Sequence, residues 1–218
     1  MTFSLEYLFT RISAALNNKV DLYRMGTFYY EGKYVPQDFA KAKAYLQKAA
    51  NKKYYKALFY LGLIELKTEK KLIDLSLALR YFLLSRQESP EALQQIRELE
   101  ERILALPASE AQQELLFKVG YMYANDVVVG LNVPKALQFY ELAANEGHPY
   151  AKMELAKLLM QSRPGVTKDI PRAYALLKEA AEADFTPARI QLQKLYERYP
   201  EYQPTKSGKH CVNPVEEV

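Results

Sequence analysis

The chain has 218 residues, 49% of them hydrophobic and 26% charged, and its formal net charge at pH 7 is +4. This balance is typical of a globular protein and excludes a chain kept disordered by a shortage of apolar residues. Gly and Pro are few, and residues that favour helices dominate nearly every segment, so we expect an all-α protein. No stretch approaches the ~20 apolar residues that a membrane-spanning helix needs, so we expect no membrane association of that kind.

A capping helix is expected at the N-terminus, in residues 1–19. Apolar residues recur there at helical spacing, at Phe3, Tyr7, Leu8, Ile12, Ala15 and Leu16. Glu6 and Arg11 interrupt the run, so the segment lacks the basic start and unbroken apolar core of a signal peptide. The single cysteine, Cys211, cannot form an internal disulfide. We therefore expect a cytoplasmic protein.

Four segments share a pattern that predicts a repeated pair of helices. A small residue in the first helix is followed by an alanine that opens the second helix. The small residues are Gly26, Gly62, Gly120 and Ala156, and the alanines are Ala42, Ala78, Ala136 and Ala173. Three positions after each alanine comes a large residue: Tyr45, Tyr81, Phe139 and Leu176. Because such positions share one helix face, we expect the large side chain to pack where the paired helices approach closely. A stacking platform for bases or sugars is a less favoured interpretation of the same aromatic positions.

A short polar residue stands four positions before each of these alanines. The four residues are Asp38, Asp74, Asn132 and Asp169. Such side chains accept hydrogen bonds from backbone N–H groups at a helix start, so all four are predicted to be N-caps. Catalytic or metal-binding carboxylates are a less favoured interpretation.

The middle of the chain breaks the regular spacing. The interval from Ala78 to Ala136 is longer than the intervals on either side and leaves room for one more helix, predicted within residues 89–106, with a turn at 107–110. We expect a repeat block with this acidic helix at 20–106, and a second block with a C-terminal helix at 107–199. Whether the insertion bends or splits the array stays open. Residues 200–218, rich in Pro and polar residues, are expected to form a flexible tail.

The repeated pattern resembles the Sel-one-like repeat (SLR) family, a subclass of tetratricopeptide-like helical repeats. The third copy carries the resemblance best, at Gly120, Tyr123, Gly130, Asn132, Lys135, Ala136, Tyr140, Ala143, Ala144, Gly147, His148 and Ala151. The resemblance implies an α/α right-handed superhelical solenoid of about four two-helix repeats, with the extra helix in the middle and capping helices at both ends. It implies a structural role for His148, and partner binding rather than a defined chemistry.

Motifs of catalysis or cofactor binding are missing from the sequence. It contains no glycine-rich phosphate loop, nucleophile elbow or paired-histidine helix motif. His210 adjoins Cys211, but no second pair of ligands completes a zinc site. Glu98, Glu100 and Glu101 are predicted to be a solvated helix face. We therefore expect no enzymatic activity, no catalytic residues, no cofactor and no metal.

Charge is distributed unevenly along the chain. Residues 33–71 hold ten lysines and three acidic residues, whereas residues 88–114 hold seven glutamates and two arginines. Such asymmetry can steer partners of opposite charge. Lys52, Lys53 and Lys56 interleave with tyrosines, so a nucleic-acid binder using this Lys/Tyr-rich block is one alternative.

A protein-interaction scaffold or adaptor is the favoured function. The first helices of stacked repeats commonly line the concave face. Positions two before and one after the recurring small residue are expected to bind a protein or peptide partner there: Arg24, Thr27, Tyr60, Leu63, Lys118, Tyr121, Glu154 and Lys157. A further alternative is an immunity-type neutraliser of a bacterial toxin. The sequence leaves the partner and the oligomeric state open.

Overall fold

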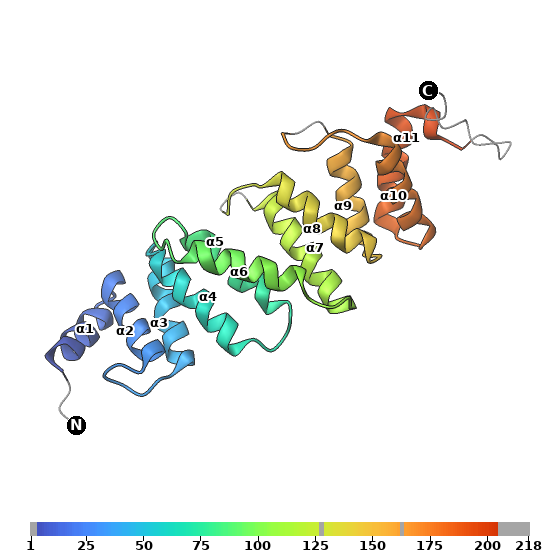
Figure 1. Cartoon of the computed structure of the whole chain (residues 1–218). Helices are drawn as coiled ribbons and strands as arrows, with labels where there is room; N and C mark the ends of the chain where they lie inside the picture. Colours follow the sequence, from blue (N-terminus) through green and yellow to red (C-terminus); the bar gives the residue numbers. More distant parts are fainter. Residues whose placement is uncertain (1–3, 127–128, 162–163, 205–218) are drawn as a thin grey trace. The chain divides into compact units, whose positions relative to one another are not determined.

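The computed structural model describes residues 4–126, 129–161 and 164–204, which contain helices and no strand (Figure 1). The helices are α1 (Leu5–Ala15), α2 (Lys19–Glu31), α3 (Phe39–Asn51), α4 (Lys56–Thr68), α5 (Asp74–Ser85), α6 (Ala92–Leu104), α7 (Glu110–Asn125), α8 (Val133–Asn145), α9 (Pro149–Leu159), α10 (Ile170–Glu182), α11 (Thr186–Arg198) and a short 3-10 helix, η1 (Pro200–Tyr202). The predicted all-α repeat fold is confirmed.

The chain forms two compact units. Unit 1 comprises Met1–Leu115 with Asp126–Gly130, and unit 2 comprises Leu116–Asn125 with Leu131–Val218, so the division falls within α7. The domain ranges expected from the sequence stay a prediction. Of the expected flexible tail, residues 200–204 are described and include η1. The possible ligands His210 and Cys211 lie outside the described residues.

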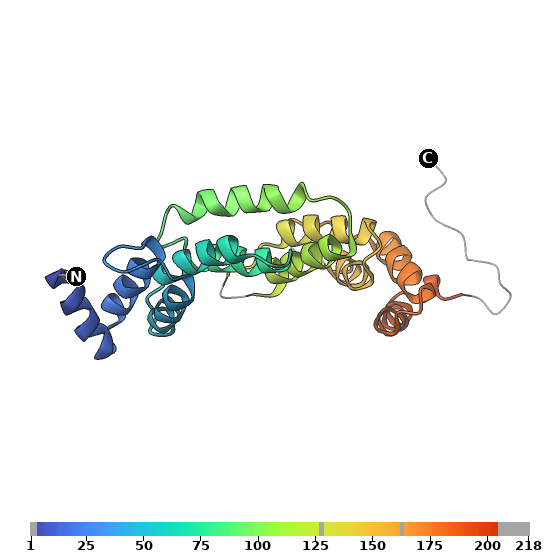
Figure 2. The same ribbon diagram turned by 90° about the horizontal axis from the view of Figure 1, so that it is seen from below.

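Unit 1 is built from consecutive packed helices. α2 packs against both α3 and α4, and α4 packs against α5. The extra helix α6 packs on α5, and Figure 2 shows it running alongside the paired helices of unit 1. Ile96, Leu99 and Ile103 are buried, as the predicted apolar face requires, whereas Leu93 is exposed. An ion pair of 2.8 Å between Arg102 Nη2 and Glu69 Oε2 further fixes α6 to the end of α4.

Close packing of the paired helices depends on the predicted glycines. A Cβ atom added to Gly26 would lie 2.5 Å from Leu46 Cγ, and one added to Gly62 would lie 2.6 Å from Phe82 Cε1. In unit 2 a Cβ on Gly120 would lie 2.7 Å from Tyr140 Cδ1. No Cβ atom fits at such distances, so the large side chain of the second helix occupies the space that each glycine leaves.

The large side chain that fills this space is not the one predicted. It comes four positions after the recurring alanine, not three, at Leu46, Phe82 and Tyr140, and each of these is fully buried. Of the residues expected there, Tyr45, Tyr81 and Leu176 are only half-buried. Phe139 is buried, and its Cβ atom lies 3.3 Å from the position that a Cβ atom on Gly120 would take. In a helix of about 100° per residue, the two positions lie on opposite sides of the alanine, and the sequence spacing does not say which side faces the glycine.

Three of the four predicted N-caps are confirmed. The side-chain oxygens of Asp38, Asn132 and Asp169 accept hydrogen bonds from the amides three residues later, at 2.9, 3.1 and 2.9 Å. The prediction that Asp74 is an N-cap is wrong, because α5 begins at Asp74 itself. Its carboxylate instead turns back and accepts hydrogen bonds of 3.1 Å from the amides of Lys70 and Lys71.

The N-terminal helix forms within the expected range but packs through an unexpected face. Tyr7, Thr10 and Ala14 are buried, and α1 packs against α2. Leu8, Ile12 and Leu16, which the sequence pattern placed on the apolar face, are exposed to solvent. The expected contact residues are therefore wrong apart from Tyr7, and Phe3 lies outside the described residues.

Unit 2 continues the paired arrangement. α8 packs against α9, and α9 packs against α10 and α11. His148 is the N-cap of α9: its Nδ1 atom accepts a hydrogen bond of 3.2 Å from the Ala151 amide, in agreement with the structural role that the resemblance implied. At the C-terminal end, η1 brings the Tyr202 ring to 5.1 Å from the Tyr174 ring. None of the helices in the described ranges is long and apolar enough to cross a membrane.

Candidate protein-interaction surface

The first helices of the repeat pairs carry the candidate surface, which we call the first-helix surface. In unit 1 it is formed by α2 and α4, which lie against each other, and in unit 2 by residues 116–125 of α7 and by α9. In α2, α4 and α7 the recurring glycine faces the second helix, and α9 carries the buried Ala156 at the same place. The surface consists of the residues on the remaining sides.

Four tyrosines form an aromatic cluster on this surface in unit 1. We define the aromatic cluster as Tyr23, Tyr30, Tyr54 and Tyr60, all half-buried. The Tyr60 ring lies 5.8 Å from Tyr23 and 5.2 Å from Tyr30 between ring centroids, both edge-on, and Tyr23 lies 5.1 Å from Tyr54. Edge-to-face pairs at these distances stabilise one another and hold the rings in fixed orientations. The cluster is thus a preordered aromatic surface that is only partly covered.

Charged groups surround the aromatic cluster. Lys67 places its ammonium group 5.0 Å from the Tyr30 ring centroid and 5.6 Å from that of Phe39. Burial is the main cause that raises the pKa of the Tyr23 and Tyr60 hydroxyls, and the neighbouring Glu31 carboxylate adds to it. Tyr23 and Tyr60 therefore stay neutral at physiological pH, as donors and acceptors of hydrogen bonds. A cation beside neutral aromatic rings suits a partner with an apolar or aromatic anchor next to an acidic group.

The partner-binding residues predicted in unit 1 lie in different environments. Arg24 is exposed and makes a 3.2 Å ion pair with Asp21, while Leu63 is half-buried. Tyr60 lies in the aromatic cluster. Thr27 is buried and its hydroxyl donates a 2.9 Å hydrogen bond to the Arg24 carbonyl oxygen, so the side chain offers nothing to a partner.

The predicted residues of unit 2 form a more polar surface. Tyr121 is 50% exposed, and Lys118 is also exposed. Glu154 and Lys157 make an ion pair of 2.8 Å on α9. Glu154 and Tyr121 both act on the buried hydroxyl of Tyr140, whose pKa is raised chiefly by burial and then by the Glu154 charge. The two helices α7 and α9 therefore share one polar surface within unit 2.

Sequence reasoning missed three members of the aromatic cluster. Tyr23 and Tyr30 lie three positions before and four positions after Gly26, so they occupy the same helix face, one turn on either side of the predicted Thr27. Tyr54 belongs to the turn before α4. The signal that could have found Tyr23 is the aromatic residue that also stands three positions before the next two glycines, as Phe59 and Phe117.

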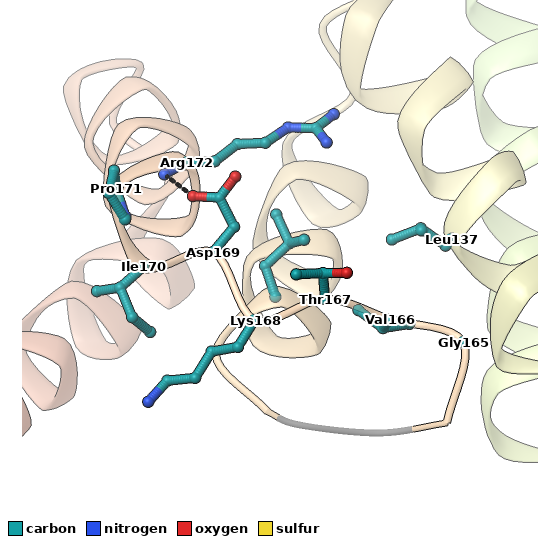
Figure 3. Close-up of a pocket in the computed structure, with 10 residues that line it drawn as sticks. Leu137, Gly165, Val166, Thr167, Lys168, Asp169, Ile170, Pro171 and Arg172 are labelled. Atoms are coloured by element: carbon teal, nitrogen blue, oxygen red, sulfur yellow. Dashed lines mark hydrogen bonds between the residues drawn. The ribbon is translucent and has the colours of Figure 1, made fainter. Parts of the chain in front are cut away.

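A pocket in unit 2 is a second candidate ligand site. It has a volume of about 570 Å³ and is lined by Leu137 of α8, by the segment before α10 and by the first turn of α10 (Figure 3). Asp169 caps α10, Arg172 pairs with Glu141 at 2.8 Å, and the Lys168 ammonium lies 5.2 Å from the Tyr199 ring centroid. These polar groups already stabilise the fold, so the pocket presents no convergent chemistry.

The described residues do not form a metal site. No group of three or more His, Cys, Asp or Glu side chains that could hold a metal ion occurs within residues 4–126, 129–161 and 164–204. Glu98 and Glu101 are exposed on α6, and Glu98 accepts hydrogen bonds from Gln94 and Gln95. Glu98 and Glu101 therefore form a solvated face of α6, whereas Glu100, which was predicted to share it, is half-buried.

Comparison with known proteins gives matches to one family of repeats. The model of the Sel1 repeat matches residues 21–54, 114–148 and 149–185, which correspond to α2–α3, α7–α8 and α9–α10. It does not match the α4–α5 pair, although this pair has the same packing of a glycine against a large residue.

Similar proteins come from fungi and bacteria. Chitin synthase regulatory factor 3 of Schizosaccharomyces pombe is 32% identical over 84 residues, which cover 38% of this chain and 9% of that protein. The chain therefore spans less than a tenth of the length of this relative. Two crystal structures show similarity: a protective antigen of uropathogenic Escherichia coli with an SLR fold (19% identity, TM-score 0.40, 88% of this chain and 44% of the other) and a Sel1 repeat protein of Oxalobacter formigenes (24%, 0.40, 84% and 66%).

Proposed function

Because the chain belongs to the Sel1 repeat proteins, we propose that it is a scaffold that binds a partner protein through its first-helix surface. Sel1 repeats generally mediate protein–protein interactions and are typically non-catalytic scaffolds. A regulatory role through partner binding is also compatible with the name of the fungal relative. The cytoplasmic location expected from the sequence stays a prediction.

The aromatic cluster of unit 1 is the observation that carries the proposal. Tyrosine is enriched among the residues that dominate binding energy at protein interfaces, because a rigid ring offers a large apolar area and one polar group. Here three such rings, Tyr23, Tyr30 and Tyr60, lie on two adjacent first helices and are held edge-on to one another. Their partial exposure leaves ring area available to a partner side chain.

The partner that suits this surface is a peptide segment with an acidic residue next to an apolar anchor. Lys67 is exposed at the edge of the aromatic cluster and Arg24 is exposed on α2. The excess of lysine over acidic residues in 33–71 would add a long-range attraction for acidic partners, and this part of the attraction would weaken with salt.

Selection of peptides from a random display library tests the proposal. The purified full chain would be used for the selection. The affinity of each selected peptide would then be measured for the wild type, for Lys67→Glu and for the matched control Lys52→Glu. Both lysines are exposed, so both variants should fold as wild type does, and each changes the net charge equally. We expect Lys67→Glu to weaken binding about tenfold, with Lys52→Glu nearly unchanged. Equal effects of the two variants would mean that only net charge matters, and the proposed surface would be wrong.

A further inference from the structure

The N-terminal helix α1 and its C-cap residue Leu16 present a row of large apolar side chains to solvent. Leu5 is 72% exposed, Phe9 70%, Ile12 60% and Leu16 80%. Side chains of this size are rarely left so exposed in a contiguous row on a monomeric protein. We call these four residues the outer row of α1.

The outer row lies on the side of α1 opposite to the rest of unit 1. With about 100° between successive residues, the four side chains project within a narrow sector, and the buried Tyr7, Thr10 and Ala14 project in the opposite direction. Small rearrangements of unit 1 cannot cover the outer row, because the opposite face of α1 already packs against the rest of unit 1.

The spacing of the outer row fits a second helix packed along it. The residues follow one another at intervals of four, three and four, which is the seam of a coiled coil, in which apolar residues repeat every 3.5 residues on average. An amphipathic helix on a lipid surface has the same spacing, so binding to lipid vesicles is the alternative outcome of the test. A helix with the same spacing can fit its side chains between these.

The spacing is also unchanged when the helix direction is reversed. Two antiparallel copies of α1, related by a two-fold axis that passes between Phe9 and Ile12, place Leu5 opposite Leu16 and Phe9 opposite Ile12, twice over. This is the self-complementary arrangement that a two-fold symmetric interface requires. The row therefore matches a second copy of itself without any further sequence.

The residues beside the outer row do not oppose this pairing. They are Glu6, Leu8, Ser13 and Ala15, of which only Glu6 is charged. The Glu6 carboxylate already accepts a 2.5 Å hydrogen bond from the Tyr34 hydroxyl of its own chain. No like charges are brought together by the two-fold axis, and Leu8 adds further apolar area.

We infer that two copies of this chain associate through antiparallel α1 helices that bury the outer row of each. At roughly 100 Å² of apolar area for each side chain, the eight side chains of the two rows together bury roughly 800 Å². Stable interfaces bury at least about 1,200 Å² in total, so the dimer is weak and depends on protein concentration. A shared dimer would double the number of first-helix surfaces and so strengthen binding to a multivalent partner.

Sedimentation equilibrium of the full chain over a range of micromolar concentrations tests the inference. The wild type is expected to rise from the monomer mass towards twice that mass. Phe9→Glu and Ile12→Lys, each alone, are expected to stay monomeric, because each buries a charge against an apolar side chain. Ile190→Lys, which changes a residue 54% exposed on α11, is the matched control and should associate as the wild type does.

Mixing the two variants tests the antiparallel direction. In that mixture the carboxylate introduced by Phe9→Glu on one copy would face the ammonium introduced by Ile12→Lys on the other. The unchanged Ile12 of the first copy would face the unchanged Phe9 of the second, so dimers are expected to return. A parallel pair would not be rescued, because the two charges would not face each other.

Three results would overturn the inference: a wild type that stays monomeric, dimers that persist in both single variants, or no rescue in the mixture. So would monomeric wild type that binds lipid vesicles through α1.

Discussion

The first-helix surfaces of the two units rest on the same packing and differ in chemistry. In unit 1, Gly62 lets α4 approach Phe82 of α5, and in unit 2, Gly120 lets α7 approach Tyr140 of α8. Yet the surface above Gly62 carries the aromatic cluster, whereas the one beside Gly120 carries an exposed tyrosine and the Glu154–Lys157 ion pair. The repeat thus specifies how helices pair, and the residues on the remaining sides are free to specify different partners.

The largest effects are expected where the two units are alike. Gly62→Ala and Gly120→Ala each place a Cβ atom within 3 Å of a buried ring, so each is expected to lower the free energy of unfolding by about 2 kcal/mol. Chemical denaturation would measure both. Phe82→Leu added to Gly62→Ala provides the control, since a smaller side chain should recover part of the loss. Additive losses in the double variant would contradict the proposed contact.

The same positions show how much of this packing could be predicted from the sequence. The small residues and the alanines recur at fixed spacing, so the helix pairs and their close approach could be inferred without a structure. The identity of the large contacting residue could not, because Tyr81 and Phe82 are adjacent, both aromatic, and differ only in which side of α5 they occupy.

The candidate surface was less predictable than the fold. Tyr60 could be placed on the first-helix surface from its distance to Gly62, but its neighbours Tyr23 and Tyr30 come from another helix. Leu8, together with Ile12 and Leu16 of the outer row, was mistaken for part of the buried face of α1, since the small residues Thr10 and Ala14 make the actual contact. Hydrophobic spacing identifies a face, and tertiary packing decides whether that face is covered.

Substitutions on the first-helix surfaces of the two units should differ more in their effect on partner affinity than in their effect on stability. Tyr60→Ala is expected to weaken partner affinity about 30-fold, as loss of a central aromatic anchor costs about 2 kcal/mol. Tyr121→Ala removes an exposed ring with fewer aromatic neighbours and is expected to weaken affinity only a few-fold. Titration calorimetry with a selected peptide would measure both, and circular dichroism would check that the variants keep their helicity. A larger loss for Tyr121→Ala would reverse the assignment of the main surface to unit 1.

A smaller effect is expected at the N-cap of unit 2. Asn132→Ala removes the acceptor of the Lys135 amide and should cost about 1 kcal/mol of unfolding free energy. Asn132→Asp keeps an acceptor at this position and serves as the control. Thermal unfolding would compare them, and equal melting temperatures for wild type and Asn132→Ala would contradict a capping role.

The smallest effect is a pH dependence at the N-cap of unit 1, where the cap is ionisable. Hydrogen bonds from the Lys41 amide hold the pKa of Asp38 below its ordinary value of 3.8. A lowered pKa in the folded state means that this carboxylate stabilises the protein above pH 4 and that the stabilisation is lost as the pH falls through the folded pKa. Denaturation at pH 7 and pH 3 should therefore show a smaller drop for Asp38→Asn than for wild type. An identical drop would contradict the assignment.

Site-specific photo-crosslinking tests the central claim most directly, because it reports which surface the partner touches. A photoreactive amino acid would replace Leu63 on the first helix α4 or, as the control, the exposed Leu77 on the second helix α5. With a selected peptide or a native partner present, we predict a crosslinked product from position 63 and none from position 77. A product from position 77 alone would contradict binding through the first-helix surface.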